Sequence, residues 1–272
     1  WSTGGNLNTA RRILAGAGTQ TAALGFGGYI GPYSALTESY NGSAWTEVND
    51  LGTARAQLGG AGTNTAALGF GGNNGSRLAL TEKWNGTNWT EVGDLNTARQ
   101  NLGGAGATNT AALAFGGEAP PSTGATELYN GTNWTEVADL TLVSTSMAGA
   151  GTSTAALSIG GDSPPGTSAK TELWNGSSWT EVNDMNTAKQ NLGGGGTTTS
   201  ALAFGGRNPS PTAQTESWNG TNWTETADLA TARTQLGGTA ASNSSGLAFG
   251  GNAPPLTAAT EEFNTGVAGG AW

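Results

Sequence analysis

The chain has 272 residues, of which 47 are Gly and only 11% are charged, and this composition excludes a helical bundle. Its 19 acidic residues outnumber 10 basic ones and it has no run of Lys or Arg, so nucleic acid is not an expected partner. No apolar stretch reaches the roughly 18 to 20 residues of a membrane span, and without His or Cys the chain lacks the usual general base, thiol nucleophile and imidazole or thiolate metal ligands.

A repeat runs through the whole chain in six copies. Its Gly-Gly pairs begin 44 or 45 residues apart, at Gly27, Gly71, Gly116, Gly160, Gly205 and Gly250. A Thr-Glu pair follows each of them, with its acid at Glu38, Glu82, Glu127, Glu172, Glu216 and Glu261. An aromatic residue comes two positions later, at Tyr40, Trp84, Tyr129, Trp174, Trp218 and Phe263. A second aromatic follows an Asn-Gly turn, at Trp45, Trp89, Trp134, Trp179 and Trp223, and Trp1 fills the same slot before the first Gly-Gly pair.

Each copy divides at its turn residues into short predicted strands. In the copy that begins at Trp89 these strands are residues 102–106, 110–115 and 126–129, and a fourth, 134–137, opens the next copy. Four antiparallel strands in each period are typical of a propeller blade. The sequence therefore predicts an all-β chain, a six-bladed β-propeller that forms a single domain over residues 1–272. The predicted blades cover approximately residues 11–49, 55–93, 99–138, 144–183, 189–227 and 233–264, the last completed by residues 1–5.

Two features support this arrangement. The first strand, Leu-Gly-Gly-Ala-Gly at 102–106, has the small residues that six strands converging on one axis would require, and Tyr129 and Trp134 would lie farther out. The last copy has no Trp in phase, because Trp272 lies nine residues after Phe263. The N-terminal segment is therefore expected to supply the fourth strand of the last blade and to hide two sheet edges.

The segments L-A-F-G-G (113–117), T-E-L-Y-N-G-T-N-W-T-E-V (126–137) and D-L-N-T-A-R (94–99) resemble kelch repeats, in which an apolar strand ends in Gly-Gly and a Tyr, a Trp and an Arg follow. The resemblance covers nearly the whole chain and implies a kelch-type propeller. The chain departs from the kelch pattern in having Trp or Phe at several Tyr positions and one residue fewer before the Trp. The near-identical N-T-A-R and G-T-N-W-T segments also resemble kelch-type proteins of marine bacteriophages, which implies a virion or fibre component.

The chemistry of catalytic propellers is only partly available to this chain. The copper radical oxidases among kelch relatives use His ligands and a Cys-modified Tyr, and the chain contains neither His nor Cys. Paired carboxylates for glycoside hydrolysis remain an alternative, but a Glu that recurs in every copy indicates a structural role. Asp162 and Glu118 have no multi-carboxylate spacing of the kind found in calcium loops. No catalytic residue, metal or cofactor is expected.

The N-G-T-N-W turns resemble the Asp box of sialidase propellers, whose active site also needs an arginine cluster. The recurring cations that could supply one are Arg11, Arg55, Arg99, Arg233 and Lys189. We interpret them as structural, as partners of loop carbonyls or of neighbouring Asp or Glu residues, such as Asp50, Asp94, Asp184 and Asp228, in exposed pairs of about 0–1 kcal/mol. The fourth copy breaks this pattern with Leu142, Val143 and Ser144.

The segment after each Gly-Gly pair differs in all six copies, whereas the strands and Asn-Gly turns change little. Antiparallel geometry places these segments at the same end as the D-L-N-T-A-R loops, and binding residues concentrate on loops of rigid scaffolds. The candidate binding residues are Tyr29, Tyr33, Arg77, Glu118, Asp162, Lys170 and Arg207. The leading hypothesis is a non-enzymatic extracellular or virion module that attaches to a partner protein or surface glycan and can assemble into a larger particle. The alternatives are a carbohydrate-active enzyme, sialidase-like or a glycosidase, and a purely structural decoration or assembly protein.

Overall fold

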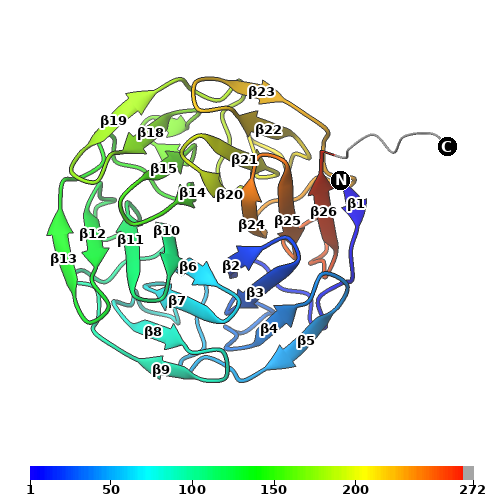
Figure 1. Ribbon diagram of the computed structural model, residues 1–272, viewed down its shortest axis with the longest axis horizontal. Helices are drawn as coiled ribbons and strands as arrows, with labels where there is room; N and C mark the ends of the chain where they lie inside the picture. The colour runs from blue at the N-terminus through cyan, green and yellow to red at the C-terminus, as the bar shows by residue number, and fades with distance from the viewer. Residues whose placement is uncertain (266–272) are drawn as a thin grey trace.

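The computed structural model describes residues 1–265 and contains six four-stranded antiparallel sheets around a central axis (Figure 1). The predicted six-bladed β-propeller is confirmed. We number the blades 1 to 6 in chain order. The described part of the chain contains no helix of the length and hydropathy that crossing a bilayer would require.

The strands fall into four rings, counted outward from the axis. The innermost strands are β2 (Ala15–Thr19), β6 (Gly59–Thr63), β10 (Gly103–Thr108), β14 (Ala148–Gly151), β20 (Gly193–Thr197) and β24 (Gly237–Ser242). The second strands are β3 (Ala22–Phe26), β7 (Ala66–Phe70), β11 (Ala111–Phe115), β15 (Ala156–Ile159), β21 (Ser200–Phe204) and β25 (Ser245–Phe249). The third strands are β4 (Thr37–Tyr40), β8 (Thr81–Trp84), β12 (Thr126–Tyr129), β18 (Thr171–Trp174), β22 (Thr215–Trp218) and β26 (Thr260–Asn264). The outer strands are β5 (Trp45–Val48), β9 (Trp89–Glu91), β13 (Trp134–Val137), β19 (Trp179–Val182), β23 (Trp223–Glu225) and β1 (Ser2–Thr3). Blade 4 adds a small hairpin, β16 (Asp162–Ser163) with β17 (Gly166–Thr167).

In blade 3 the predicted third and outer strands match β12 and β13, but the predicted first strand is shifted. It begins one residue later than expected because Asn101, two residues before β10, has a φ of 54° that interrupts extended backbone. It also ends later, at Thr108, which pairs with Ala111 beyond an irregularity in the ladder.

The innermost strands approach one another too closely for side chains at some positions. A Cβ on Gly149 would lie 2.1 Å from the carbonyl oxygen of Gly104 in the neighbouring blade. A Cβ on Gly103 would lie 2.3 Å from the ring of Phe115 in its own blade. The Gly-rich first strand is therefore required by contacts between and within blades, and the strands still enclose an axial channel of about 180 Å³.

The core lies between adjacent blades and not inside any one of them. Leu113 and Phe115 point toward Trp179 of blade 4, whereas Ala112 and Ala114 face blade 2, as the period-2 alternation of a strand requires. Both faces of each sheet are thus buried, which explains how a chain with so few charged residues forms a stable ring.

A hydrogen bond repeated in every blade links each outer strand to the preceding blade. The indole Nε1–H of the outer-strand Trp donates to the Oγ1 of a Thr that begins the third strand of that blade, at 3.0 Å in all six cases. The pairs are Trp1–Thr215, Trp45–Thr260, Trp89–Thr37, Trp134–Thr81, Trp179–Thr126 and Trp223–Thr171. The Trp slot in the repeat is therefore an inter-blade latch.

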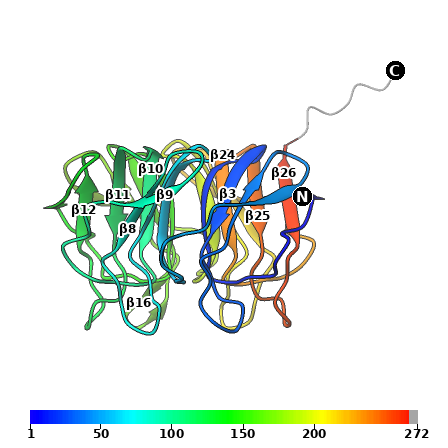
Figure 2. The ribbon, with the colours of Figure 1, turned by 90° about the horizontal axis from the view of Figure 1, so that it is seen from below.

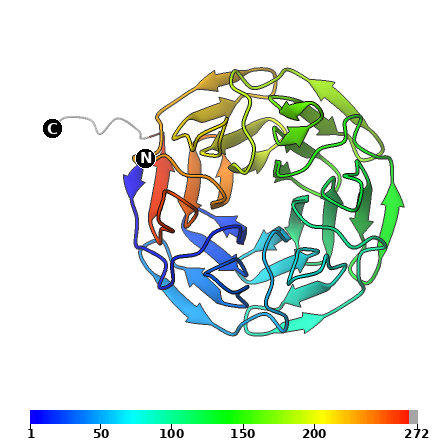
Figure 3. The ribbon, with the colours of Figure 1, turned by 180° about the vertical axis from the view of Figure 1, so that it is seen from behind.

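The N-terminal strand closes the ring as predicted (Figure 3). Ser2 and Thr3 of β1 pair with Glu262 and Glu261 of β26, and the Trp1 ring packs against Phe204 and Phe263 at centroid distances of 5.0 and 5.2 Å. Trp272, which lacks the Trp phase, lies outside the described residues.

Candidate binding surface

The two ends of the propeller are built differently (Figure 2). One end carries the six segments that follow the Gly-Gly pairs, which we call the variable loops: residues 29–34, 73–78, 118–123, 162–167, 207–212 and 252–257. Isolated β-bridges join these loops to the loops between blades, for example Tyr29 to Arg12 and Glu118 to Gln100. The predicted placement of both loop types at one end is thus confirmed, and we call it the variable-loop end. The other end, the repeated end, carries the Asn-Gly turns and the turns between the first and second strands.

Backbone contacts fix the base of each variable loop whatever its sequence. The second Gly of each Gly-Gly pair accepts a hydrogen bond that closes the loop, as in Ser34 N to Gly28 O at 2.8 Å and Thr123 N to Gly117 O at 2.9 Å. Its own N–H donates to the next inter-blade loop, as in Gly28 N to Arg55 O at 2.8 Å. Both glycines of the pair have positive φ, 67° and 107° at Gly27 and Gly28, a backbone region in which a Cβ is strained. The tips can therefore change without moving their bases.

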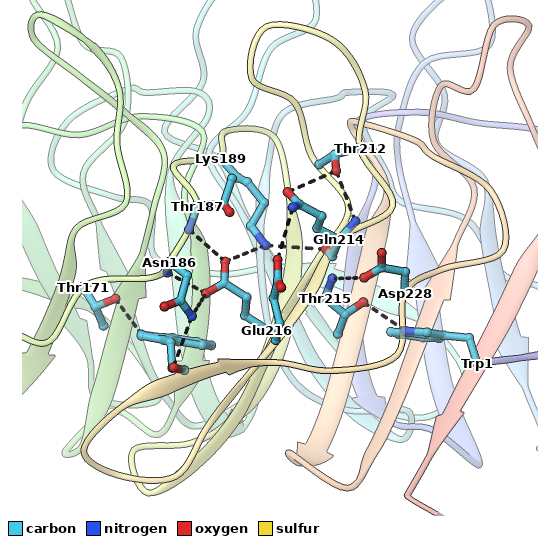
Figure 4. A network of polar contacts seen from close by, with 12 residues as sticks. Trp1, Thr171, Asn186, Thr187, Lys189, Thr212, Gln214, Thr215, Glu216 and Asp228 are labelled. Atoms are coloured by element: carbon cyan, nitrogen blue, oxygen red, sulfur yellow. Dashed lines mark hydrogen bonds and ion pairs between the residues drawn. The ribbon is translucent and has the colours of Figure 1, made fainter.

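A buried ion pair anchors each inter-blade loop in five of the six blades, and we call this unit the clamp. The cation comes from the inter-blade loop and the acid from the third strand of the blade that follows, with N–O distances of 2.8–3.3 Å. The five pairs are Arg11–Glu38, Arg55–Glu82, Arg99–Glu127, Lys189–Glu216 and Arg233–Glu261. The cation also donates to a carbonyl before the third strand, and the Glu accepts a loop N–H, as Glu127 does from Asn96 at 2.7 Å. Figure 4 shows the clamp of blade 5 beside the Trp1–Thr215 latch.

The four Asp named as partners of these cations are wrong, and so is the predicted exposure of the pairs: the partners are buried Glu residues of the third strands. Arg55 and Arg99 are 0% exposed and do not form exposed pairs with Asp50 or Asp94. Asp50 accepts instead from the backbone N–H of Thr37, and Asp94 from that of Thr81, both at 3.0 Å. The predicted loop carbonyls are partners, as Arg55 donates to Leu80 and Arg99 to Ala125, but both also donate to carbonyls within the second strands. Burial lowers the pKa of Arg99, and the charge of Glu127 opposes that shift.

Blade 4 has the acid of the clamp without its cation. Ser144 stands where the other blades have Arg or Lys, and its Oγ donates to the carbonyl of Gly160 at 3.3 Å. Glu172 accepts from the backbone N–H groups of Thr141 and Leu142, at 2.8 and 3.1 Å. No Lys or Arg of residues 1–265 pairs with Glu172.

A ring of strained residues surrounds the mouth of the channel at the variable-loop end. Six non-glycine residues, one from each inter-blade loop, have φ between 49° and 59°: Ile13, Gln57, Asn101, Ser146, Asn191 and Gln235. Each donates its N–H to the carbonyl of the ring member before it, at 2.7–3.0 Å, so the six hydrogen bonds form a closed circle. The ring lines a hollow of about 90 Å³ together with the Leu or Met that follows each member. The circle fixes the six inter-blade loops relative to one another, which makes the centre of this end rigid.

Four of the predicted binding residues come together across blades 1 to 3. Tyr29 and Tyr33 pack edge to face at 5.5 Å, and the Arg12 guanidinium lies 5.3 Å from the centre of the Tyr29 ring. The Tyr33 hydroxyl donates to Asn73 of blade 2 at 2.7 Å. In the adjacent loops Arg77 pairs with Glu118 of blade 3 at 3.6 Å. We call these residues, with Gln100 and Asn101, the aromatic–amide cluster.

The remaining predicted residues lie apart from this cluster. Asp162 is part of the hairpin of blade 4 and bridges to Thr145. Lys170 turns to the circumference and pairs with Glu181 and Asp184 at 2.6 and 3.1 Å, and these hydrogen bonds raise its pKa. Arg207 is exposed on blade 5 and pairs with no acid in the part of the chain that the structure describes.

The sequence interpretation missed several members of the cluster, namely Arg12, Asn73, Gln100 and Asn101. Gln100 donates to Glu118 at 2.7 Å and Asn101 to the other oxygen of the same carboxylate at 3.0 Å, while Asn73 donates to Gln100. The two positions after each clamp residue vary between copies, as Arg12-Ile13 and Gln100-Asn101 show. This variation inside a constant motif was the signal that could have identified them.

Two results bear on chemistry at this end. Within residues 1–265, no three acidic side chains gather closely enough to hold a metal ion. No model of a known protein family and no curated protein matches the chain.

Proposed function

We propose that the protein is a non-enzymatic attachment module that holds a surface glycan at its variable-loop end, on the aromatic–amide cluster of blades 1 to 3. The observation that carries this proposal is the joining of Tyr29, Tyr33, Asn73, Arg77 and Glu118 by contacts between loops that differ in every copy and stand on fixed bases. Such an arrangement presents a rigid surface with chemistry that is specific to one side of the ring.

The chemistry of the cluster suits a sugar. Tyr rings offer an apolar face with a polar tip, and amide, carboxylate and guanidinium groups together supply both donors and acceptors for hydroxyl groups. Loops with fixed bases lose little conformational entropy when they bind.

The basic side chains of the variable-loop end favour an acidic glycan. Five of the ten basic residues are buried in clamps, and of the other five, Arg12, Arg77 and Arg207 lie at the variable-loop end. The outer strands present Glu47, Glu91, Glu136, Glu181 and Glu225 to solvent. Arg12 and Arg77 would pair with the acidic groups of a glycan bound at the cluster, whereas exposed acids such as Asp50 and Asp94 on the inter-blade loops give this end no net positive field.

A protein partner is the second candidate. The loops of blades 1 and 2, Y-I-G-P-Y-S and N-N-G-S-R-L, contain the Tyr, Ser, Gly, Asn and Arg that dominate antibody paratopes. An enzyme is less well supported, because glycoside hydrolysis generally uses two carboxylates and Glu118, the one acid of the cluster, is tied to Arg77, Gln100 and Asn101.

The repeat itself supports a kelch-like origin, and the near-identical copies support a place in a phage particle or another extracellular assembly. The Gly-Gly, aromatic, Trp and Arg pattern carries both resemblances. A role as a decoration protein that binds nothing would leave the variable loops without a ligand.

A glycan array that includes sialylated and other acidic glycans tests the proposal. Wild-type protein should bind a defined subset, and Tyr29→Ala/Tyr33→Ala should lose that binding while keeping its unfolding midpoint. Arg77→Ala/Arg207→Ala should weaken binding to acidic glycans more than to neutral ones. Absence of binding to any glycan would contradict the glycan proposal, and release of free sugar from bound glycans would favour the enzyme.

A further inference from the structure

The five clamps show what surrounds the buried Glu when its cation is present. In blade 3 the Arg99 guanidinium donates to the carbonyl of Ala125 at 2.9 Å and to that of Ala114 at 3.4 Å, and it pairs with Glu127 at 3.1 Å. One carboxylate and two backbone carbonyls thus converge on a single cationic group. Carboxylates of this kind are rarely buried unless a cation or several hydrogen bonds compensate them.

The equivalent oxygen atoms of blade 4 are in register with those of blade 3. Ser158 pairs with Glu172 across the β15–β18 ladder, as Ala114 pairs with Glu127 across β11–β12. Lys170 precedes Thr171 as Ala125 precedes Thr126, and its carbonyl accepts from Gly160 at 2.8 Å, as that of Ala125 does from Gly116 at 3.0 Å. The carbonyls that meet the guanidinium in blade 3 therefore have counterparts around Glu172.

The cation itself has no counterpart from the chain. Ser144 is too short to reach the carboxylate and donates to a carbonyl instead. Lys170, the nearest basic residue in the sequence, pairs with Glu181 and Asp184 on the circumference. Glu172 is nevertheless only 4% exposed. It is therefore as buried as the Glu of a clamp, but no basic side chain of the described residues compensates its charge.

We propose that blade 4 binds a small monovalent cation between the carboxylate of Glu172 and the carbonyls of Ser158 and Lys170, in the place that an Arg or Lys side chain fills in the other blades. A single carboxylate with backbone carbonyls suits a monovalent ion, because carbonyl oxygens can replace its hydration shell. Divalent ions are generally held by more than one carboxylate or keep several waters. The site does not depend on the proposed glycan surface.

Thermal unfolding at constant ionic strength tests this site, with choline chloride replaced stepwise by the chloride of sodium, potassium, ammonium or guanidinium at low concentration. Guanidinium is the group that four of the five clamps supply, and ammonium is the group of the fifth, so these two ions are the most direct probes. The unfolding midpoint of wild type should rise saturably with at least one of these ions, by about 2 to 4 °C when the ion is at about ten times its Kd.

Three variants show whether the rise in unfolding midpoint comes from a cation bound at Glu172. Ser144→Arg supplies the cation from the chain and should abolish the response, and Glu172→Gln should abolish it by removing the charge. Arg99→Ser leaves the Glu of blade 3 without its cation, as in blade 4, and should enlarge the rise in midpoint. The proposal is overturned if wild type shows no saturable rise with any of the four ions, or if Glu172→Gln responds as wild type does. If Ser144→Arg does not fold, Glu172→Gln answers the same question.

Discussion

The repeated end and the variable-loop end are stabilised by different kinds of contact. At the repeated end the turn residues hold themselves: Asn130 accepts from the N–H groups of Thr132 and Asn133, at 3.0 and 2.9 Å, and the same turn recurs at Asn41, Asn85, Asn175 and Asn219. At the variable-loop end the clamps and backbone bridges hold the loop bases from outside. The loop tips there are not needed to hold the bases, and their sequences differ from copy to copy.

The largest expected effect comes from breaking a clamp. Arg99→Ala leaves the Glu127 carboxylate buried without its cation and should lower the free energy of unfolding by about 3 to 5 kcal/mol. Asn130→Ala, the matched change at the repeated end, should cost about 1 kcal/mol because it removes an exposed turn acceptor. Denaturant titrations measure the loss of unfolding free energy in each variant, and an m-value equal to that of wild type shows that the two losses can be compared. Equal losses would contradict the contrast between the two ends.

The clamp was also the main failure of the sequence interpretation, although the repeat predicted the ring, the closure and the end that carries the variable loops. Asp94 lies only five residues before Arg99 in the chain, which favours it as the partner, whereas the actual partner, Glu127, is brought next to Arg99 by the third strand. Charged residues are usually exposed, and this expectation concealed a buried pair. The contacts of the aromatic–amide cluster could not be predicted because they depend on how loops of neighbouring blades lie in three dimensions, as Tyr33 and Asn73 do.

A smaller loss is expected from an inter-blade latch. Thr81→Val removes the acceptor of the Trp134 indole N–H and should cost about 1 to 3 kcal/mol, since a buried donor is left unpaired. Thr65→Val, at an exposed turn of the repeated end, should change the free energy of unfolding by less than about 0.5 kcal/mol. Urea unfolding of the two variants side by side compares them. A Thr81→Val variant as stable as wild type would show that the latch is not structural.

A pH-dependent loss is expected at the seam between blades 1 and 6. The Tyr40 hydroxyl donates to Glu262 at 2.5 Å, and burial with this hydrogen bond raises its pKa from 10.0 to about 12. As the pH rises, the unfolded chain loses the Tyr40 proton before the folded chain does. The contribution of this hydrogen bond to the free energy of unfolding is therefore complete below pH 10 and is lost as the pH rises toward 12. Burial also raises the pKa of Tyr129, so the comparison of wild type with Tyr40→Phe isolates the seam. Identical alkaline unfolding curves for the two proteins would rule out this contribution.

The smallest effect on stability, and the largest on binding, is expected at the loop tips. Replacing residues 29–33 and 73–77 by Gly and Ser of equal length leaves the loop bases in place and should change the unfolding midpoint only slightly. Calorimetry gives the midpoint. A large loss of stability would show that these tips are part of the framework.

The most direct test of the account is the binding of a glycan identified on the array, measured by surface plasmon resonance for two variants. One has the tips at 29–33 and 73–77 replaced as above, and the other has Thr63, Thr65, Thr108 and Thr110 at the repeated end changed to Ala. The account predicts that the first variant loses binding while it stays folded and that the second binds as wild type does. Retained binding in the first variant, or loss confined to the second, would contradict it.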